Sequence, residues 1–190
     1  MRDLVYVMRR ATTADLEPIA AMIKEREEWL FKRGNASYGQ GTAVLGLIGQ
    51  PVEYSTVIGL FREEDGQVLG CSVLLPAAPA VPGWTAAELR ERTWIETMCH
   101  THPAFGQDRV GWLMAMGIGG YAARHPHSPQ WLRCRVPAVL VAHYRDELGW
   151  ELVRAHRDPD LGQLYLMQRR PETRRGAAGL ITSEMSVEEL

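Results

Sequence analysis

The chain has 190 residues, which is enough for one domain with a hydrophobic core of its own. Hydrophobic residues make up 46% of it and charged residues 23%, as in ordinary globular proteins. The net charge of -2 at pH 7 argues against a general nucleic-acid-binding protein, because such proteins are usually basic. Four arginines near the C-terminus leave a local basic patch open: Arg154, Arg157, Arg169 and Arg170.

The cysteines and the apolar runs argue against several classes of protein. Cys71, Cys99 and Cys134 are odd in number, widely spaced and without a CxxC pair, which argues against a disulfide framework or a cysteine zinc site. Residues 1–10 lack the basic start and apolar stretch of a signal peptide. No apolar run approaches the roughly 18 residues of a membrane span. We therefore expect a cytoplasmic protein that has no membrane partner.

The N-terminal part has the pattern of a strand followed by a helix. Residues 4–10 are rich in β-formers, and apolar residues at helical spacing predict an amphipathic helix over residues 13–32. Thr12 and Asp15 have the spacing of a capping box at the start of that helix. The glycine-rich segment 34–50 predicts a flexible connection with a short helix near residues 42–48. This segment lacks the Gly-Lys-Ser/Thr ending of a P-loop, so its glycines indicate an ordinary loop. If the segment has a function, we expect it to form a mobile wall over a substrate.

The later part of the chain predicts a mixed sheet. In chain order we expect strands at 55–62 and 67–75 around an Asp65-Gly66 turn, a loop at 76–82, a strand at 92–100, a helix at 107–124, a strand at 131–136, a helix from Pro137 to about 148, and strands at 150–156 and 161–169. Glycines at 117, 119 and 120 would let the 107–124 helix lie close on a sheet. Strands 92–100 and 131–136 are joined through a helix, so they should be parallel. Residues 1–170 then form one domain, and residues 171–190 a polar tail.

The segment THPAFGQDRVGWLMAM, residues 101–116, carries the clearest functional signal. It leaves the end of a strand, passes through a short polar loop and enters a helix. The first N–H groups of a helix have no partner within the helix, so this arrangement can bind an anion.

Four phrases in the same order resemble the GCN5-related N-acetyltransferases: RRATTADL at 9–16, EDGQVLG at 64–70, HPAFGQDRVG at 102–111 and YRDELGWE at 144–151. The resemblance implies an α/β fold with a mostly antiparallel sheet, one splayed parallel strand pair and helices on both faces. It also implies an enzyme that transfers an acetyl group from acetyl-CoA to a primary amine of a small molecule or peptide. A non-catalytic acyl-CoA-binding sensor or partner module of the same fold is the alternative.

The same resemblance implies where the cofactor would bind. A backbone N–H at Met98, Cys99 or His100 would face the thioester. The diphosphate would lie on the loop and helix start formed by Gln107, Asp108, Arg109, Val110, Gly111 and Trp112. In this loop only Gly111 keeps a glycine usual to the family, because Gln107 and Arg109 stand where the others would be. Backbone N–H groups can still bind phosphate, and Arg109 can add a charged contact. Pro137 stands where the family often has an asparagine that contacts the cofactor.

Candidate catalytic residues follow from the chemistry of acetyl transfer. Tyr144 falls near the tyrosine that the family places by the CoA sulfur, and its phenol can protonate a leaving thiolate; His143 is the alternative. For the base we name Glu96 first, with His100 and His102 as alternatives. Strand periodicity puts Glu96 and His100 on one face, so the two could share a site. A packing role remains open for Tyr144, and a solvent-facing or ion-paired strand position remains open for Glu96.

Other chemistries fit less well. The pairs His100-x-His102 and His125-x-His127 lack a third ligand set, so we expect no metal. No serine lies in a G-x-S-x-G elbow, which argues against a serine hydrolase. The tryptophans are scattered and do not form a base-stacking stripe, so no nucleic acid is expected. Exposed strand edges near the C-terminus leave a homodimer open.

Overall fold

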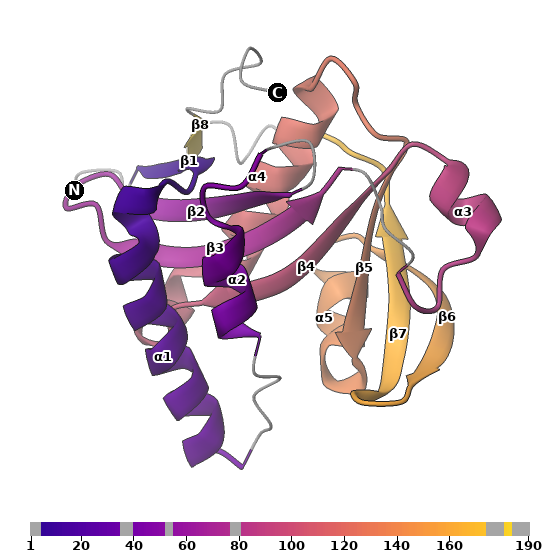
Figure 1. The fold of residues 1–190 in the computed structure, drawn as a ribbon, viewed down its shortest axis with the longest axis horizontal. Coiled ribbons are helices and arrows are strands. Elements are labelled where there is room, and N and C mark those ends of the chain that lie inside the picture. The colour runs from indigo at the N-terminus through magenta and orange to yellow at the C-terminus, as the bar shows by residue number, and fades with distance from the viewer. Residues whose placement is uncertain (1–4, 35–39, 52–54, 77–80, 174–180, 184–190) are drawn as a thin grey trace.

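An eight-stranded sheet runs through the computed structural model in the order β6-β7-β5-β4-β3-β2-β1-β8 (Figure 1). The structure describes residues 5–34, 40–51, 55–76, 81–173 and 181–183. The strands are β1 (Tyr6–Arg10), β2 (Thr56–Arg62), β3 (Val68–Leu75), β4 (Thr93–Thr101), β5 (Trp131–Pro137), β6 (Glu151–Asp158), β7 (Gly162–Arg169) and β8 (Ile181–Ser183). The helices are η1 (Thr13–Asp15), α1 (Leu16–Lys32), α2 (Gly41–Leu47), α3 (Ala86–Arg90), η2 (Pro103–Asp108), α4 (Val110–Arg124) and α5 (Ala138–Asp146).

Local sequence signals explain the N-terminal elements. Asp15 accepts hydrogen bonds from the Thr12 N–H at 2.8 Å and from Arg9 at 2.7 Å, which confirms a capped start for the first helix. The bond from Arg9 holds the pKa of Asp15 down to about 2. Gly66 turns the β2–β3 hairpin with a φ of 71°, as the Asp-Gly signal predicts.

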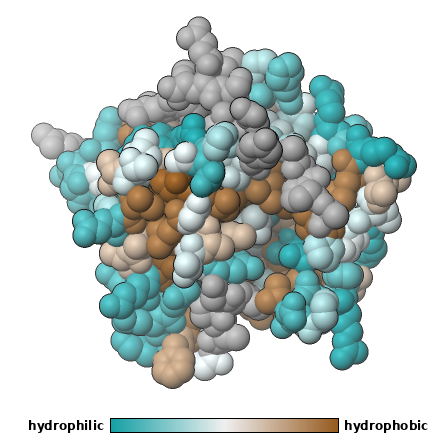
Figure 2. All heavy atoms as spheres, in the orientation of Figure 1, coloured by the Kyte–Doolittle hydropathy of each residue, from teal (hydrophilic) through white to brown (hydrophobic). Residues whose placement is uncertain are grey.

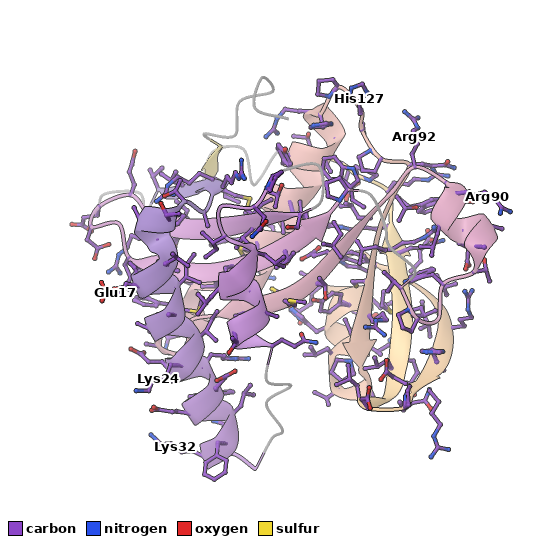
Figure 3. All side chains as sticks on the ribbon, viewed as in Figure 1. Glu17, Lys24, Lys32, Arg90, Arg92 and His127 are labelled. Carbon is purple, nitrogen blue, oxygen red and sulfur yellow. The ribbon has the colours of Figure 1, made fainter. Side chains whose placement is uncertain are left out.

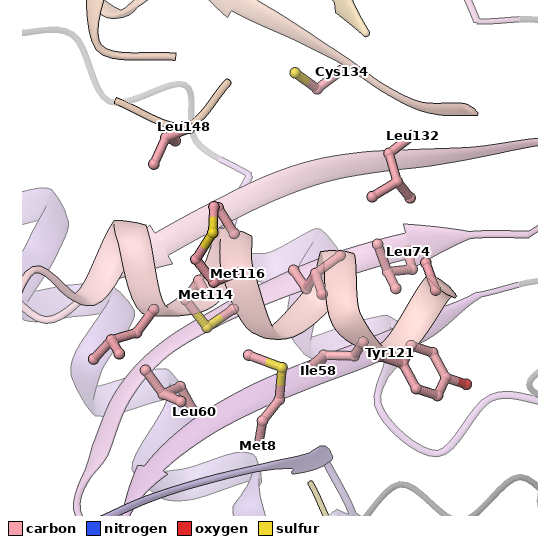
Figure 4. Close-up of a cluster of buried hydrophobic side chains, with 14 of the residues drawn as sticks. Met8, Ile58, Leu60, Leu74, Met114, Met116, Tyr121, Leu132, Cys134 and Leu148 are labelled. Carbon is pink, nitrogen blue, oxygen red and sulfur yellow. The ribbon is translucent and has the colours of Figure 1, made fainter. Parts of the chain in front are cut away.

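Helices cover both faces of the sheet and form two main cores. Helices α1 and α2 cover one face in Figure 1, and α4 and α5 lie on the other. Ile19 and Ile23 of α1 pack with Cys71 of β3 on the first face. On the second face, residues of α4 pack across the strands, as Figure 4 shows for Met114 beside Leu60 and for Tyr121 near Ile58. Each core is continuous because both faces of the central strands are apolar.

Glycines in α4 let this helix lie close to its neighbours. A Cβ at Gly117 would meet Met8 Sδ at 2.5 Å, and one at Gly119 would meet Arg169 Nη2 at 2.9 Å. The prediction that these glycines permit close packing is confirmed, because any larger residue would force its neighbours to shift.

Two short elements escaped prediction. Helix α3 begins at a capping box in which the Thr85 N–H donates to the Glu88 carboxylate at 2.8 Å, but it is too short to show periodicity. Strand β8 pairs in parallel with β1, so the sheet has a second parallel pair besides β4 and β5. Parts of the expected 34–50 connection, the 76–82 loop and the 171–190 tail lie outside the described residues.

The segment around α3 joins the two halves of the sheet. Trp84 packs there with Ile95 of β4 and Leu166 of β7. Arg133 of β5 is 2% exposed, and its guanidinium donates to Thr93 Oγ1 at 2.9 Å and forms an ion pair with Glu91. The buried cation therefore ties α3 to the start of β4 and the start of β5.

Candidate functional site

Strands β4 and β5 separate after a short parallel contact. Thr93–Ile95 pairs with Trp131–Arg133, and the pairing goes no further. Beyond that point β5 stays paired with β7, while β4 stays paired with β3, so the two strands diverge in Figure 1. Facing backbone groups on the two strands then no longer bond to each other and are open to a ligand. The splayed parallel pair expected from the family resemblance is confirmed.

A β-bulge lies on β4 beside this opening. The register with β3 moves from Val73 opposite Thr97 to Cys71 opposite His100, so β4 carries one extra residue. Met98 has a φ of 52°, which is unfavourable for a side chain with a Cβ. The bulge therefore leaves a backbone N–H in this stretch outside the regular hydrogen-bond ladder between β3 and β4. This is the stretch in which the thioester donor was expected.

The bulge places Glu96 and His100 on opposite faces of the sheet. Antiparallel partners point to the same face, so Glu96 points with Leu74 and His100 points with Cys71. Leu74 belongs to the core under α4, whereas Cys71 belongs to the core under α1. The expectation that Glu96 and His100 share a face is wrong, because the extra residue reverses the alternation on which it rested.

The loop before α4 keeps the geometry of an anion site although it has lost glycines. Arg109 has left-handed dihedrals, with φ 52° and ψ 40°, and precedes the first turn of α4. The Leu113 N–H bonds to the Arg109 carbonyl at 3.0 Å, so the N–H groups of Val110, Gly111 and Trp112 come before the first intrahelical bond. A Cβ at Gly111 would meet nothing within 4 Å, which leaves space beside these N–H groups.

Side chains around the loop carry both signs of charge. Arg109 is 61% exposed, lies over the Trp112 ring at 5.3 Å and pairs at 3.5 Å with Glu147, the residue that follows α5. Glu147 also lies 3.1 Å from His143 Nδ1. Asp108 brings a negative charge into the loop, where it adds to the effect of burial in raising the pKa of Tyr6. An anion would thus meet N–H groups of the first helical turn and one exposed cation, with an acidic side chain nearby.

Tyr144 and Glu96 lie on the α4–α5 face of the opening. Burial raises the pKa of Tyr144 well above its ordinary value, and Cys134 and Glu96 raise it further. Burial also raises the pKa of Glu96, which is 5% exposed, while the cation of Arg169 opposes that shift. Glu96 Oε2 has no hydrogen-bond partner among the described residues. At neutral pH the phenol therefore keeps its proton, and the carboxyl group lies in a site that disfavours its charged form.

Cys99 lies at the bulge between the two faces. Its side chain is exposed, although enough protein surrounds the sulfur to raise the pKa of the thiol, and the carboxylate of Glu96 raises it further. Arg26 of α1 has the opposite effect on the same pKa. Cys99 therefore lies within electrostatic range of groups on both sides of the sheet, and its raised pKa keeps it a neutral thiol.

The remaining histidine candidates have local partners. His102 accepts the Ala104 N–H at Nδ1, 3.2 Å away, and its Nε2 lies 3.4 Å from Glu25. Nδ1 of His102 thus helps to shape the turn after β4, and Nε2 faces a carboxylate of α1. His100 differs, because its Nε2 is buried and has no partner in the described part of the chain. Burial lowers the pKa of His100, and Glu27 of α1 raises it again in part.

The sequence did not reveal the roles of two arginines. Arg169 is 4% exposed, donates to the Ala115 carbonyl of α4 and lies over the Trp150 ring at 4.9 Å. Arg154 pairs with Glu88 at 2.5 Å instead of joining a basic patch. Arg154 and Arg169 therefore do not contribute to the basic patch that the sequence left open, whereas Arg157 and Arg170 are exposed. Arg154 and Arg169 lie on β6 and β7, and the sequence alone did not predict which side chains of these strands are buried.

The described residues contain neither a metal-binding cluster nor a membrane-spanning helix. Over the described residues, no three or more His, Cys, Asp or Glu side chains come together as metal ligands would. None of the helices within the described ranges combines the length and apolarity needed to cross a membrane.

Comparison with known proteins gives a clear result for the fold. No protein-family model and no curated protein sequence matches the chain. Among solved structures, a GNAT-family acetyltransferase from Listeria monocytogenes matches with a TM-score of 0.66 and 14% identity, over 87% of this chain and 94% of that one. The ribosomal-protein-S18-alanine N-acetyltransferase from Escherichia coli matches with a TM-score of 0.60 and 11% identity, over 90% and 96% of the two chains.

A third similar structure was solved with a ligand. An aminoglycoside acetyltransferase in complex with coenzyme A matches with a TM-score of 0.62 and 15% identity, over 92% of this chain and 97% of that one. The chain therefore has the fold of the GNAT acetyltransferases, with the mixed sheet, the splayed pair and the helices that the resemblance led us to expect.

Proposed function

We propose that the chain is an N-acetyltransferase that moves the acetyl group of acetyl-CoA directly to a primary amine. The observation that carries this proposal is the opening between β4 and β5, with a strained bulge at Met98 on one side and the start of α4 at its end. The only two described non-glycine residues with positive φ are Met98 and Arg109, and both lie where the cofactor would bind. Strain of this kind persists where surrounding structure enforces it, often at functional sites.

The cofactor would bind along this opening. Its diphosphate would accept hydrogen bonds from the N–H groups of Val110, Gly111 and Trp112, within reach of Gln107 and Asp108 of the same loop. Arg109 is exposed enough to leave Glu147 and contact a phosphate oxygen. The pantetheine arm would lie between β4 and β5 and bond to backbone groups that the strands no longer offer each other.

The thioester would lie at the bulge. A backbone N–H from Met98 to His100 would donate to the thioester oxygen and stabilise the negative charge that develops when the amine attacks. The amine nitrogen forms a bond to the carbonyl carbon, and the carbon–sulfur bond breaks. Tyr144 then gives its proton to the CoA thiolate, for which its raised pKa keeps a proton available.

The proton lost by the amine needs a base. Glu96, our first choice from the sequence, lies on the same face as Tyr144, whereas His100 lies on the α1 face. We favour His100, because burial lowers its pKa and leaves it neutral at pH 7, with Nε2 unpartnered among the described residues. Glu96 remains the alternative base. A His100→Gln variant should lose the acidic limb of the pH–rate profile, whereas Glu96→Gln should keep it.

A second function is favoured by the charges in the loop. Asp108 adds a negative charge near the proposed diphosphate site, and Arg109 already pairs with Glu147. A protein that binds acyl-CoA weakly as a sensor or partner module, without turnover, would have the same fold.

A thiol-release assay separates these functions. Acetyl-CoA is incubated with the full chain and a panel of primary amines, and CoA binding is measured in parallel by calorimetry. Thiol release that depends on an amine supports the acetyltransferase. CoA binding without release on any amine would favour the binding module, and an absence of CoA binding would exclude both.

A further inference from the structure

The acceptor side of the proposed site contains an unusual cation. Arg26 of α1 is half-buried, and desolvation lowers the pKa of its guanidinium. It lies over the Trp29 ring at 4.6 Å, and Arg33 lies over the same ring at 4.0 Å. Arg26 is within α1 and Arg33 is the residue that caps its C-terminus, and both guanidinium groups pack against the same indole ring.

The arginines beside Trp29 differ from the arginines that form ion pairs in this structure. Arg9, Arg133 and Arg154, for example, each bond to a carboxylate. Within the described ranges, no Asp or Glu oxygen lies within 4.0 Å of the Arg26 or Arg33 guanidinium. Residues 35–39, which follow α1 in the sequence, include no acidic residue. A half-buried cation with no carboxylate partner costs free energy unless a ligand supplies the anion.

Helix α1, which carries Arg26, packs against β4 on the face to which His100 points. The charge of Arg26 opposes the rise in the pKa of the Cys99 thiol at the bulge, and it contributes to lowering the pKa of His100. Glu27, the next residue, acts on His100 in the opposite direction. The cation is therefore on the side of the sheet from which an amine would approach His100.

We propose that the acceptor amine carries an oxyanion group, a carboxylate or a phosphate, which Arg26 binds through paired N–H groups. This inference rests on the proposed acetyltransferase function. Trp29 packs against the guanidinium of Arg26, and Arg33 adds a second positive charge after the C-terminal end of the helix. With the oxyanion held there, the amine of the same molecule lies toward His100 and the thioester. Amino acids and their phosphonate analogues have this combination of groups, whereas purely cationic amines lack it.

The test compares matched acceptors with the full chain. Each amino acid in the panel is paired with its amide, which keeps the amine and removes the negative charge, and with an aminoalkylphosphonate of similar length. We expect kcat/KM to be about 10- to 100-fold higher for an acceptor with an oxyanion than for its amide, as a charged hydrogen bond would give. The better of the carboxylate and phosphonate arms identifies the source of the anion.

Variants assign the preference to one residue. Arg26→Met should lower kcat/KM for the anionic acceptor by about 10- to 100-fold and leave the amide nearly unchanged, and Arg26→Lys should recover part of the loss. Lys24→Met removes an exposed cation from the outer side of α1, which Figure 3 shows turned away from α2, and should change neither value. The affinity of Arg26→Met for acetyl-CoA, measured by calorimetry, should equal that of the wild type. Equal affinity would show that the variant is folded.

The outcomes separate this inference from the function on which it rests. Turnover of amines with no preference for oxyanions, or an equal preference in Arg26→Met, would overturn the role of Arg26 and leave the acetyltransferase in place. If no amine in the panel reacts, the proposed function fails and the acceptor proposal fails with it.

Discussion

The two halves of β4 differ in pairing, burial and strain. The first half, Thr93–Ile95, is buried and pairs with β5, and Ile95 also pairs with β3. The second half, from Thr97 to Thr101, is partly exposed, has lost β5 as a neighbour and contains the bulge at Met98. One strand thus provides both a fixed base and an open end.

The polar groups around the two halves also differ in their hydrogen bonding. Arg133, beside the first half, bonds to Thr93 Oγ1, to Gln168 and to the Glu91 carboxylate. Beside the second half, Glu96 Oε2 and His100 Nε2 have no hydrogen-bond partner in the described part of the structure. The hydrogen bonds of Arg133 fix the strands together at the base of the splay, and Glu96 and His100 leave polar atoms without partners near the open end, where a ligand would bind.

A pair of tyrosine variants gives the largest expected contrast. Tyr144 is coupled to groups at the open end, whereas Tyr121 packs against Trp94 of the fixed half at a ring distance of 5.7 Å. Tyr144→Phe should lower kcat about 100-fold, because it removes the proton donor, with acetyl-CoA affinity unchanged. Steady-state kinetics and calorimetry measure the two quantities. A similar loss of kcat in Tyr121→Phe would remove the distinction between the halves.

Arg133→Met tests the fixed half. Removing a buried cation with several partners should lower the free energy of unfolding by about 2–4 kcal/mol, measured by urea denaturation. Acetyl-CoA affinity should stay within a few-fold of the wild type under folding conditions. Arg135→Met is the control, because Arg135 is more exposed and pairs with Asp158 alone, so its loss should be about 1 kcal/mol or less. Equal losses in the two variants would show that Arg133 has no special role at this junction.

Arg109 separates backbone geometry from side-chain charge in the anion loop. Arg109→Gly should raise the free energy of unfolding by up to about 1 kcal/mol, because glycine adopts the left-handed conformation without strain. Arg109→Ala keeps the strain and removes the charge, so it should weaken CoA binding several-fold while kcat at saturation changes little. Unchanged CoA affinity in Arg109→Ala would show that the side chain is not a phosphate ligand.

Glu96→Gln should have a smaller effect, which appears as a change in how the free energy of unfolding depends on pH. The pKa of Glu96 is raised in the folded state, so the folded protein holds this proton where the unfolded chain has released it. The wild type should therefore lose stability as pH rises from about 4.3 through the raised pKa. Glu96→Gln should remove that decline, so its stability relative to the wild type should be greater at pH 8 than at pH 5 in urea denaturation. A constant difference across this range would contradict the raised pKa.

Much of the fold could be predicted from the sequence because its signals are local. The Thr12–Asp15 cap, the Gly66 turn and the order of strands around the 107–124 helix are each read from residues close in the chain. The bulge at Met98 could not be read in this way, since no glycine marks it, and missing it put Glu96 and His100 on one face. Arg26 and Arg169 were missed because their significance depends on burial and on partners distant in sequence.

Hydrogen–deuterium exchange with and without acetyl-CoA tests the central claim most directly. The account places the thioester at the bulge and the diphosphate at the start of α4. Saturating acetyl-CoA should therefore slow backbone amide exchange in peptides that cover residues 97–101 and 106–112, with little change in peptides that cover residues 86–95. Binding of acetyl-CoA that leaves exchange at 97–101 and 106–112 unchanged would contradict the proposed site.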